Sequence, residues 1–117
     1  MANYLLLFHG GSMPDSPEEG ARVMQAWTDW FALLGDVVVD SGSPISQRRT
    51  LGADGSVGSG DANSVTGYTV LQANDIDAAV LLAKTCPGLA SGTWLEVTEL
   101  SGGMKPARLS ELRYSVQ

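Results

Sequence analysis

The sequence has few residues of the kinds that support metal, redox or nucleic-acid chemistry. It contains one cysteine, Cys86, and one histidine, His9, among its 117 residues. A single cysteine excludes an intramolecular disulfide bond, and these two residues cannot supply a common zinc ligand set. Lysine and arginine number 7 against 13 aspartates and glutamates, so the formal net charge is -6. This acidic balance argues against nucleic acid or an anionic membrane as a partner.

Long apolar segments and targeting signals are also missing. No apolar run approaches the ~20 residues that a membrane-spanning helix needs. Residues 4–8 are apolar, but no basic region precedes them and no cleavage pattern follows them, which excludes a signal peptide. We therefore expect a soluble, cytoplasmic protein without membrane partners, bound metal or cofactor. The 44% hydrophobic and 17% charged content is typical of a globular chain, which we expect to form one domain over residues 1–103.

The clearest helix signal lies near the N-terminus. Ser16-Pro17-Glu18-Glu19 has the pattern of a capping box, in which the Ser16 side chain accepts from the Glu19 backbone and Glu19 reaches back to Ser16. Apolar residues then recur at helical spacing, and Gly35 is a typical helix stop. This pattern predicts a helix over residues 17–34.

The remaining patterns predict four strands, a second helix and a long loop. We expect strands at residues 4–8, 37–39, 65–71 and 93–100, the first of them buried on both faces. Asn74 or Asp75 is expected to cap a second helix that runs to about Lys84. Residues 43–64 are expected to form a loop with a short β excursion at the Asp54-Gly55 turn.

The resulting order, βαββαβ, predicts an α+β fold of the ferredoxin-like type. In this arrangement two helices cover one face of a four-stranded antiparallel sheet. The other face needs a different cover, and Tyr68 and Trp94 are expected to lie on it. Because large exposed apolar patches usually mark interfaces, we predict a face-to-face homodimer, a dimeric α+β barrel with a cavity between the sheets.

Residues 104–117 differ in character from the rest of the chain. They contain three of the seven basic residues, together with leucine and valine at spacings compatible with a short amphipathic helix. We interpret them as a C-terminal tail that packs on the partner subunit or, alternatively, as a frayed terminus.

Several segments resemble the YCII-related family. The resemblance covers roughly residues 3 to 100 and rests on Tyr4-Leu5-Leu6-Leu7-Phe8-His9-Gly10-Gly11, Ala26-Trp27, Leu33-Leu34-Gly35-Asp36, Val39-Asp40-Ser41-Gly42, Thr66-Gly67-Tyr68, Ala78-Ala79 and Cys86-Pro87. It implies a ferredoxin-like unit that pairs into a dimeric α+β barrel. Some members resemble lyases and isomerases of ring-cleavage pathways.

The chain departs from this family at two places. Many members carry an Asp-Gly-Pro-Phe stretch before the third strand, where this chain reads Gly58-Ser59-Gly60-Asp61-Ala62-Asn63. The family members that are thought to be catalytic carry a histidine on the first helix, and the first helix here has none. No catalytic residue carries over at that position.

His9 and Asp40 are the candidate catalytic residues. Each stands at the end of a predicted strand, and a histidine near neutral pH can act as a general acid or base. Whether the two converge depends on strand register, because a shift of one residue turns a side chain to the opposite face. Alternatively, His9 only makes a hydrogen bond to a neighbouring loop.

Tyr68, Trp94 and Glu96 are the candidate ligand-binding residues. They are expected to point into the cavity between the two sheets, and an aromatic cavity with a few polar groups is the usual form of a small-molecule site. Alternatively, they only fill a dimer interface. Cys86 is expected to be a small buried apolar residue, and the Trp27, Trp30 and Phe31 stripe is expected to pack in the core.

These features leave two classes of function open. In the first class, the protein binds a small aromatic or enolisable acid or lactone in the dimer cavity, with or without transforming it as a lyase or isomerase. Alternatively, it is a non-catalytic structural or protein-interaction dimer.

Overall fold

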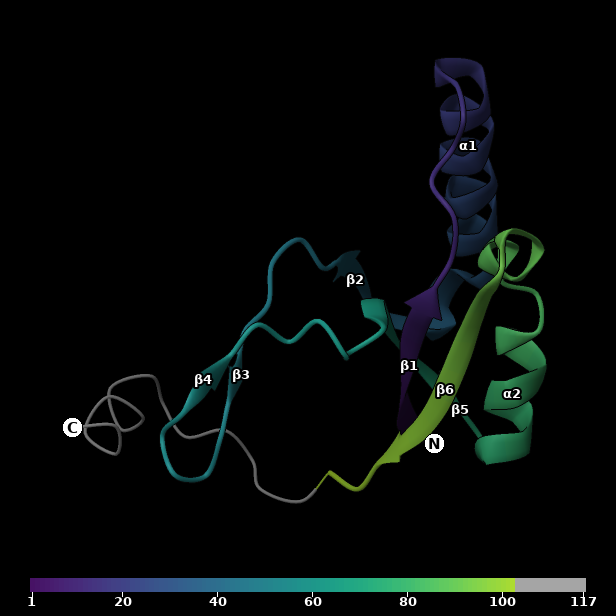
Figure 1. The fold of residues 1–117 in the computed structure, drawn as a ribbon. Coiled ribbons are helices and arrows are strands. Elements are labelled where there is room, and N and C mark those ends of the chain that lie inside the picture. Colours follow the sequence, from purple (N-terminus) through teal and green to yellow (C-terminus); the bar gives the residue numbers. More distant parts are fainter. Residues whose placement is uncertain (103–117) are drawn as a thin grey trace, which may run out of the picture.

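The computed structural model describes residues 1–102, which form the predicted α+β fold (Figure 1). The main elements are β1 (Ala2–Gly10), α1 (Pro17–Leu34), β2 (Val38–Pro44), β5 (Val65–Ala73), α2 (Ile76–Ala83) and β6 (Thr93–Leu100). A small hairpin, β3 (Thr50–Leu51) and β4 (Val57–Gly58), connects β2 to β5, and the 3-10 helices η1 (Gly35–Val37) and η2 (Pro87–Ser91) follow α1 and α2. The predicted tail, residues 104–117, lies outside the described residues.

The main sheet has the strand order β2-β5-β1-β6, and every neighbouring pair is antiparallel. Both helices contribute to one core on the same face of this sheet. The connectivity and strand order are consistent with the predicted ferredoxin-like fold. Within residues 1–102, no helix combines the length and the apolar character needed to cross a membrane.

The start of α1 follows the predicted cap in part. The Ser16 hydroxyl group accepts a hydrogen bond from the Glu19 backbone N–H at 3.1 Å, and Pro17 occupies the first turn. The Glu19 carboxylate does not return to Ser16 as predicted; it accepts from the Asp15 backbone N–H at 3.1 Å. In a standard capping box this carboxylate accepts from the N-cap residue itself, whereas here it holds the residue before the N-cap. Gly35 follows the helix with φ near 60°.

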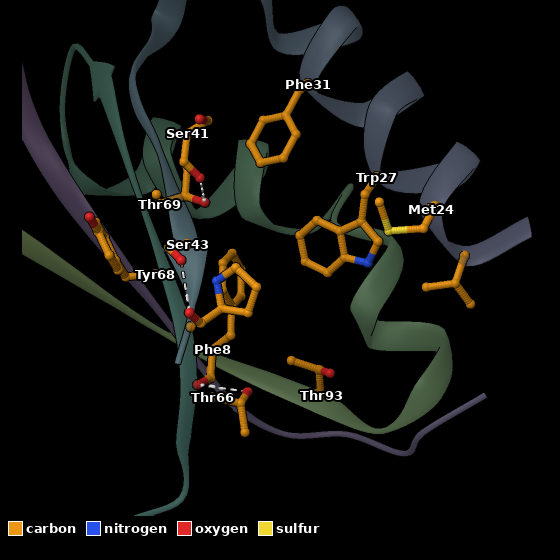
Figure 2. A pocket seen from close by; sticks show the side chains of 14 residues that line it. Phe8, Met24, Trp27, Phe31, Ser41, Ser43, Thr66, Tyr68, Thr69 and Thr93 are labelled. Carbon is orange, nitrogen blue, oxygen red and sulfur yellow. Dashed lines mark hydrogen bonds between the residues drawn. The ribbon is translucent and has the colours of Figure 1, made fainter. Parts of the chain in front are cut away.

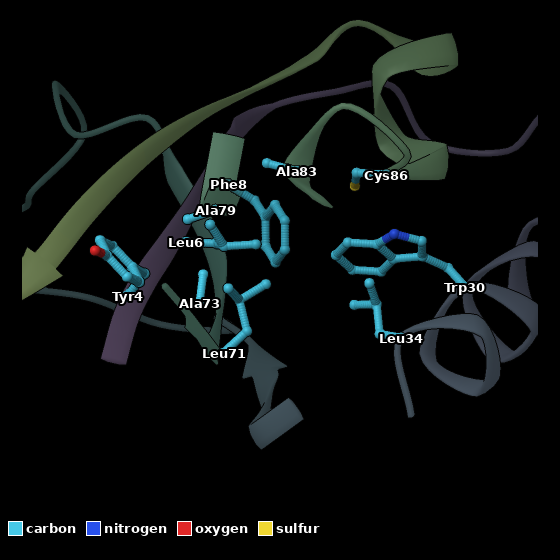
Figure 3. Packing of buried hydrophobic residues seen from close by; sticks show 10 residues of the cluster. All are labelled: Tyr4, Leu6, Phe8, Trp30, Leu34, Leu71, Ala73, Ala79, Ala83 and Cys86. Carbon is cyan, nitrogen blue, oxygen red and sulfur yellow. The ribbon is translucent and has the colours of Figure 1, made fainter. Parts of the chain in front are cut away.

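The core lies between the helices and one face of the sheet (Figure 3). Leu6 of β1 and Leu71 of β5 are fully buried, and Trp30 and Leu34 of α1 and Ala79 of α2 pack on the same face. Burying these side chains supplies most of the free energy that stabilises a domain of this size. α2 begins at its predicted cap residue, because the Asp75 carboxylate accepts a hydrogen bond from the Ala78 backbone N–H at 2.8 Å. The helix that starts there packs on this core.

Strand β1 differs from its prediction in burial. Tyr4, Leu6 and Phe8 are buried under the helices, whereas Leu5 and Leu7 point to the opposite face and are only half-buried. The prediction of burial on both faces is therefore wrong for the single chain, because two helices cover one face only.

Strand β2 is longer than predicted and irregular. It continues to Pro44, with register shifts on either side of Asp40. Gly42 has φ near 76°, and a Cβ atom at this position would lie 1.7 Å from the Tyr68 carbonyl oxygen. Only glycine permits the two strands to approach this closely.

Candidate functional site

The face of the sheet opposite the helices, which we call the open face, carries most of the predicted site residues. Strand alternation places Leu5, Leu7 and His9 of β1 on it. The antiparallel register then adds the residues directly opposite or diagonal to these: Tyr68 and Val70 of β5, and Trp94, Glu96 and Thr98 of β6. The described residues provide no helix that covers this face.

His9 is the most strongly held polar side chain on the open face. It is only 6% exposed, although it lies next to the end of β1. Its Nε2 atom lies 2.5 Å from Glu96 Oε1, and its Nδ1 atom lies 2.7 Å from Ser64 Oγ. The Glu96 side chain is half exposed, so the pair stands at the boundary between protein and solvent.

The two partners of His9 are compatible with one arrangement of protons. When Glu96 is an ionised carboxylate it can only accept, and Nε2 then donates to it. Nδ1 of a neutral imidazole is then the acceptor for the Ser64 hydroxyl group. A hydroxyl group, an imidazole and a carboxylate in sequence form the arrangement in which a base is oriented by a third group.

Trp94 covers one side of the His9 ring. The two rings stack with their centroids 3.9 Å apart and an angle of 8° between their planes. Trp94 is still 53% exposed, so its outer side remains free within the described part of the chain. The stack fixes the imidazole orientation and places a flat aromatic surface beside it.

The register brings Tyr68 near this cluster. Tyr68 pairs with Leu7, and Leu7 pairs with Glu96 on its other side, so Tyr68 and Glu96 flank Leu7 in one row across the sheet. Figure 2 shows the Tyr68 side chain directed away from Trp27 of α1, onto the open face. His9, Tyr68, Trp94 and Glu96 therefore share one half of that face.

Asp40 lies elsewhere on the sheet. It pairs with Val70, which pairs with Leu5, so two strand spacings and four residues along β1 separate it from His9. Strand geometry puts their Cα atoms about 16 Å apart. The Asp40 carboxylate accepts from the Gly42 backbone N–H at 2.8 Å, which supports the irregular turn of β2. The structure does not bring the two predicted catalytic residues together.

Ser64 is the site residue that sequence reasoning missed. It reaches His9 because the pairing of β1 and β5 shifts between Phe8 and His9, so that His9 pairs with Val65 rather than with Thr66. The Gly10 backbone N–H also donates to the Ser64 carbonyl oxygen at 3.0 Å, which fixes this contact. A local irregularity of this kind leaves no recognisable pattern in the sequence.

Metal ligands do not gather at this site. In residues 1–102, no three histidine, cysteine, aspartate or glutamate side chains lie close enough together to hold a metal ion.

Comparison with known proteins does not assign a family. No protein-family model matches the chain, and no curated protein matches it.

Proposed function

We propose that the protein is a YCII-related homodimer that binds a small aromatic or enolisable molecule between the open faces of two protomers. The observation that carries this proposal is the His9 imidazole, held between Glu96 and Ser64 and stacked on Trp94. A rigidly oriented base beside an exposed aromatic surface is suited to a small-molecule site.

His9 acts as the proton acceptor in this proposal. In this proposal the Ser64 hydroxyl group, 2.7 Å from Nδ1, moves aside so that a substrate proton donor takes its place. A substrate C–H or O–H adjacent to a carbonyl group gives its proton to Nδ1, and the Glu96 carboxylate stabilises the imidazolium that forms. Return of the proton to a different substrate atom completes an isomerase reaction. In a lyase reaction the bond to the leaving group breaks as the double bond forms, and the leaving group takes the proton from the imidazolium, which restores neutral His9.

The negative charge of Glu96 restricts the classes of ligand that we expect at this site. Glu96 lies directly beside His9, so an anionic group bound next to the imidazole would face a carboxylate. Lactones and phenols are therefore better candidates than small carboxylates, and an acid would bind with its carboxylate remote from His9. Trp94 and Tyr68 supply the aromatic contacts. Asp40 stays a separate candidate at the far end of the same face.

A thermal-shift panel of phenols, lactones and small keto and hydroxy acids tests the proposal. A ligand at about 100 times its Kd adds about 2.7 kcal/mol to the free energy of unfolding. For a compound that is turned over, His9→Gln should lower kcat by about 10²- to 10⁴-fold, and Glu96→Gln should lower it in the same direction. Asp40→Asn reports whether Asp40 takes part.

Asp36→Asn is the matched control, because Asp36 is an exposed carboxylate in η1, away from the open face. It should behave as the unaltered protein does. Turnover that survives both His9→Gln and Glu96→Gln would contradict the assigned roles.

A non-catalytic role is the second candidate function, and a separate observation favours it. Both ring nitrogens of His9 already have partners within the chain, and the ring is buried. A histidine in this state also serves to fasten β1 to β6 and to the end of the β4–β5 connection. This role predicts that His9→Gln lowers thermal stability while no compound in the panel is converted to product.

A further inference from the structure

A cavity lies on the opposite side of the sheet from His9, between the sheet and α1. Its volume is about 460 Å³. Val23, Met24, Trp27 and Phe31 of α1 form one wall, and the ends of β1, β2, β5 and β6 form the other (Figure 2). An engineered cavity of about 150 Å³ already accommodates benzene, so this space is ample for two fused rings.

The composition of the two walls explains why the space stays open. The α1 wall carries large side chains, whereas the sheet beneath it presents small residues, including Ser41, Gly42, Ser43 and Gly67. Farther along the helix, Trp30 and Leu34 reach the core and are buried. An apolar cavity of this size that opens to the surface has the usual form of a small-molecule site.

Aromatic rings dominate the inner lining. The rings of Phe8 and Trp27 meet edge to face, with their centroids 5.3 Å apart and an angle of 84° between their planes. Trp27 and Phe31 are tilted by 37°, with their centroids 6.2 Å apart. Aromatic rings at these mutual angles can contact a planar aromatic guest through both their edges and their faces.

The charge of the lining restricts the guest further. The lining includes no lysine, arginine, histidine, aspartate or glutamate among the described residues. A charged ligand would lose its hydration there without gaining a partner, so an uncharged molecule is required.

The hydroxyl groups of the lining allow at most a weak polar substituent on the guest. The Ser43 hydroxyl donates to the Pro44 carbonyl oxygen at 2.8 Å, and the Thr66 hydroxyl donates to the Phe8 carbonyl oxygen at 3.3 Å. The hydroxyl groups of Ser41 and Thr93 make no hydrogen bond within residues 1–102, so they are available to a ligand hydroxyl group.

From these observations we propose that the cavity between α1 and the sheet is a second binding site, which takes an uncharged aromatic molecule of about two fused rings. This site lies on the helix side of the sheet and does not depend on dimerisation or on His9, although Tyr68 of the open face also contributes to its lining. Phe8 and His9 are neighbours in β1, but they belong to opposite faces of the sheet.

Isothermal titration with 2-naphthol, which is uncharged at pH 7, tests the proposal directly. The unaltered protein should bind it saturably, and 2-naphthalenesulfonate, which has a similar shape but is anionic, should bind at least tenfold more weakly. Val23→Trp places an indole in the cavity and should weaken 2-naphthol binding at least tenfold. Met24→Trp, at the exposed rim, should do the same and serves if Val23→Trp does not fold.

Leu33→Trp is the matched control, because it adds the same side chain on the outer surface of α1, where Leu33 is 73% exposed. It should bind 2-naphthol as the unaltered protein does. Trp94→Ala tests whether 2-naphthol binds in this cavity or on the open face. Because Trp94 does not line the cavity, this variant should still bind 2-naphthol. The proposal is overturned if 2-naphthol does not bind, if both filling variants bind it unchanged, if the sulfonate binds equally well, or if Trp94→Ala abolishes binding.

Discussion

Cys86 shows how burial sets the chemistry of one residue. The side chain belongs to the core cluster and is only 4% exposed, as expected for a small apolar residue (Figure 3). Desolvation raises the pKa of its thiol above the ordinary value of 9.0, against the opposing effect of the Gly88 and Leu89 backbone N–H groups. The folded state therefore favours the neutral thiol, which is the unreactive form.

This shift predicts both slow modification and a loss of stability in alkali. Ellman's reagent at pH 8 should react with native Cys86 far more slowly than with the denatured chain. Because the folded pKa is raised, the stabilising contribution is complete below pH 9.0 and is lost as the pH rises through the folded pKa. Denaturant titrations between pH 7 and 10.5 should show this loss in the unaltered protein and a smaller one in Cys86→Ala. Equal alkaline losses in the two proteins would contradict the assignment.

Single residues were predictable where their role depends on alternation along a strand. Trp94 and Glu96 lie on the open face, as the period of two along residues 93–100 predicted. Glu96 is diagonal to His9 across β1 and β6, a distance that long side chains span. The contact between Ser64 and His9 was not predictable, because it depends on a register shift that only the folded sheet reveals.

At the scale of elements, the start of α1 offers a direct test of helix capping. Ser16→Ala removes the oxygen that accepts from the Glu19 backbone N–H and should lower the free energy of unfolding by about 1 kcal/mol. Urea denaturation followed by circular dichroism measures this difference. Ser16→Asp keeps an acceptor at the same position and should retain most of the stability. A fully stable Ser16→Ala variant would show that the contact between Glu19 and Asp15 alone holds the helix start.

Element boundaries were predictable where a local signal marks them. The predicted helix over residues 17–34 and the strand over residues 93–100 agree with α1 and β6. The hairpin β3–β4 follows from the Asp54-Gly55 turn, in which the Asp54 carboxylate accepts from the Ser56 backbone N–H at 2.9 Å. Strand β2 extends past its prediction because its irregular pairing with β5 accommodates the glycine and serine residues that resembled a strand end.

At the scale of the whole molecule, the open face predicts association. Leu5, Leu7 and Val70 are half-buried and Trp94 is exposed on this face, which the helices of the described residues do not cover. Sedimentation equilibrium at micromolar concentration should give twice the chain mass of 12.3 kDa. Leu5→Lys places a charge in the middle of this surface and should yield monomers, because burying an unpaired charge is costly.

Leu33→Lys is the control for this experiment, because Leu33 is exposed on the outer surface of α1. It should leave the mass unchanged. A monomeric unaltered protein would refute the dimer, and with it the proposed site between two open faces. The cavity between α1 and the sheet would be unaffected by that result.

The overall architecture was predictable, whereas the cavity between α1 and the sheet was not. The order of helices and strands, together with the rule that two helices cover one face, leads to the observed sheet. The Trp27, Trp30 and Phe31 stripe packs in the core as expected, since Trp30 is buried and Trp27 and Phe31 are partly buried against the core cluster. The cavity that Trp27 and Phe31 also line was not predictable, because a helical pattern indicates which side of a helix faces the sheet and not how far from the sheet the helix stands.

Gly42 has a consequence for the search for relatives of this chain. The approach of β2 to the Tyr68 carbonyl oxygen leaves no space for any side chain at this position. Most of the surface can change its composition without changing the fold, but a chain that pairs its strands in this way has to keep glycine there. In alignments of very divergent sequences, a glycine at this position therefore indicates which residues of β2 and β5 correspond to those of this chain.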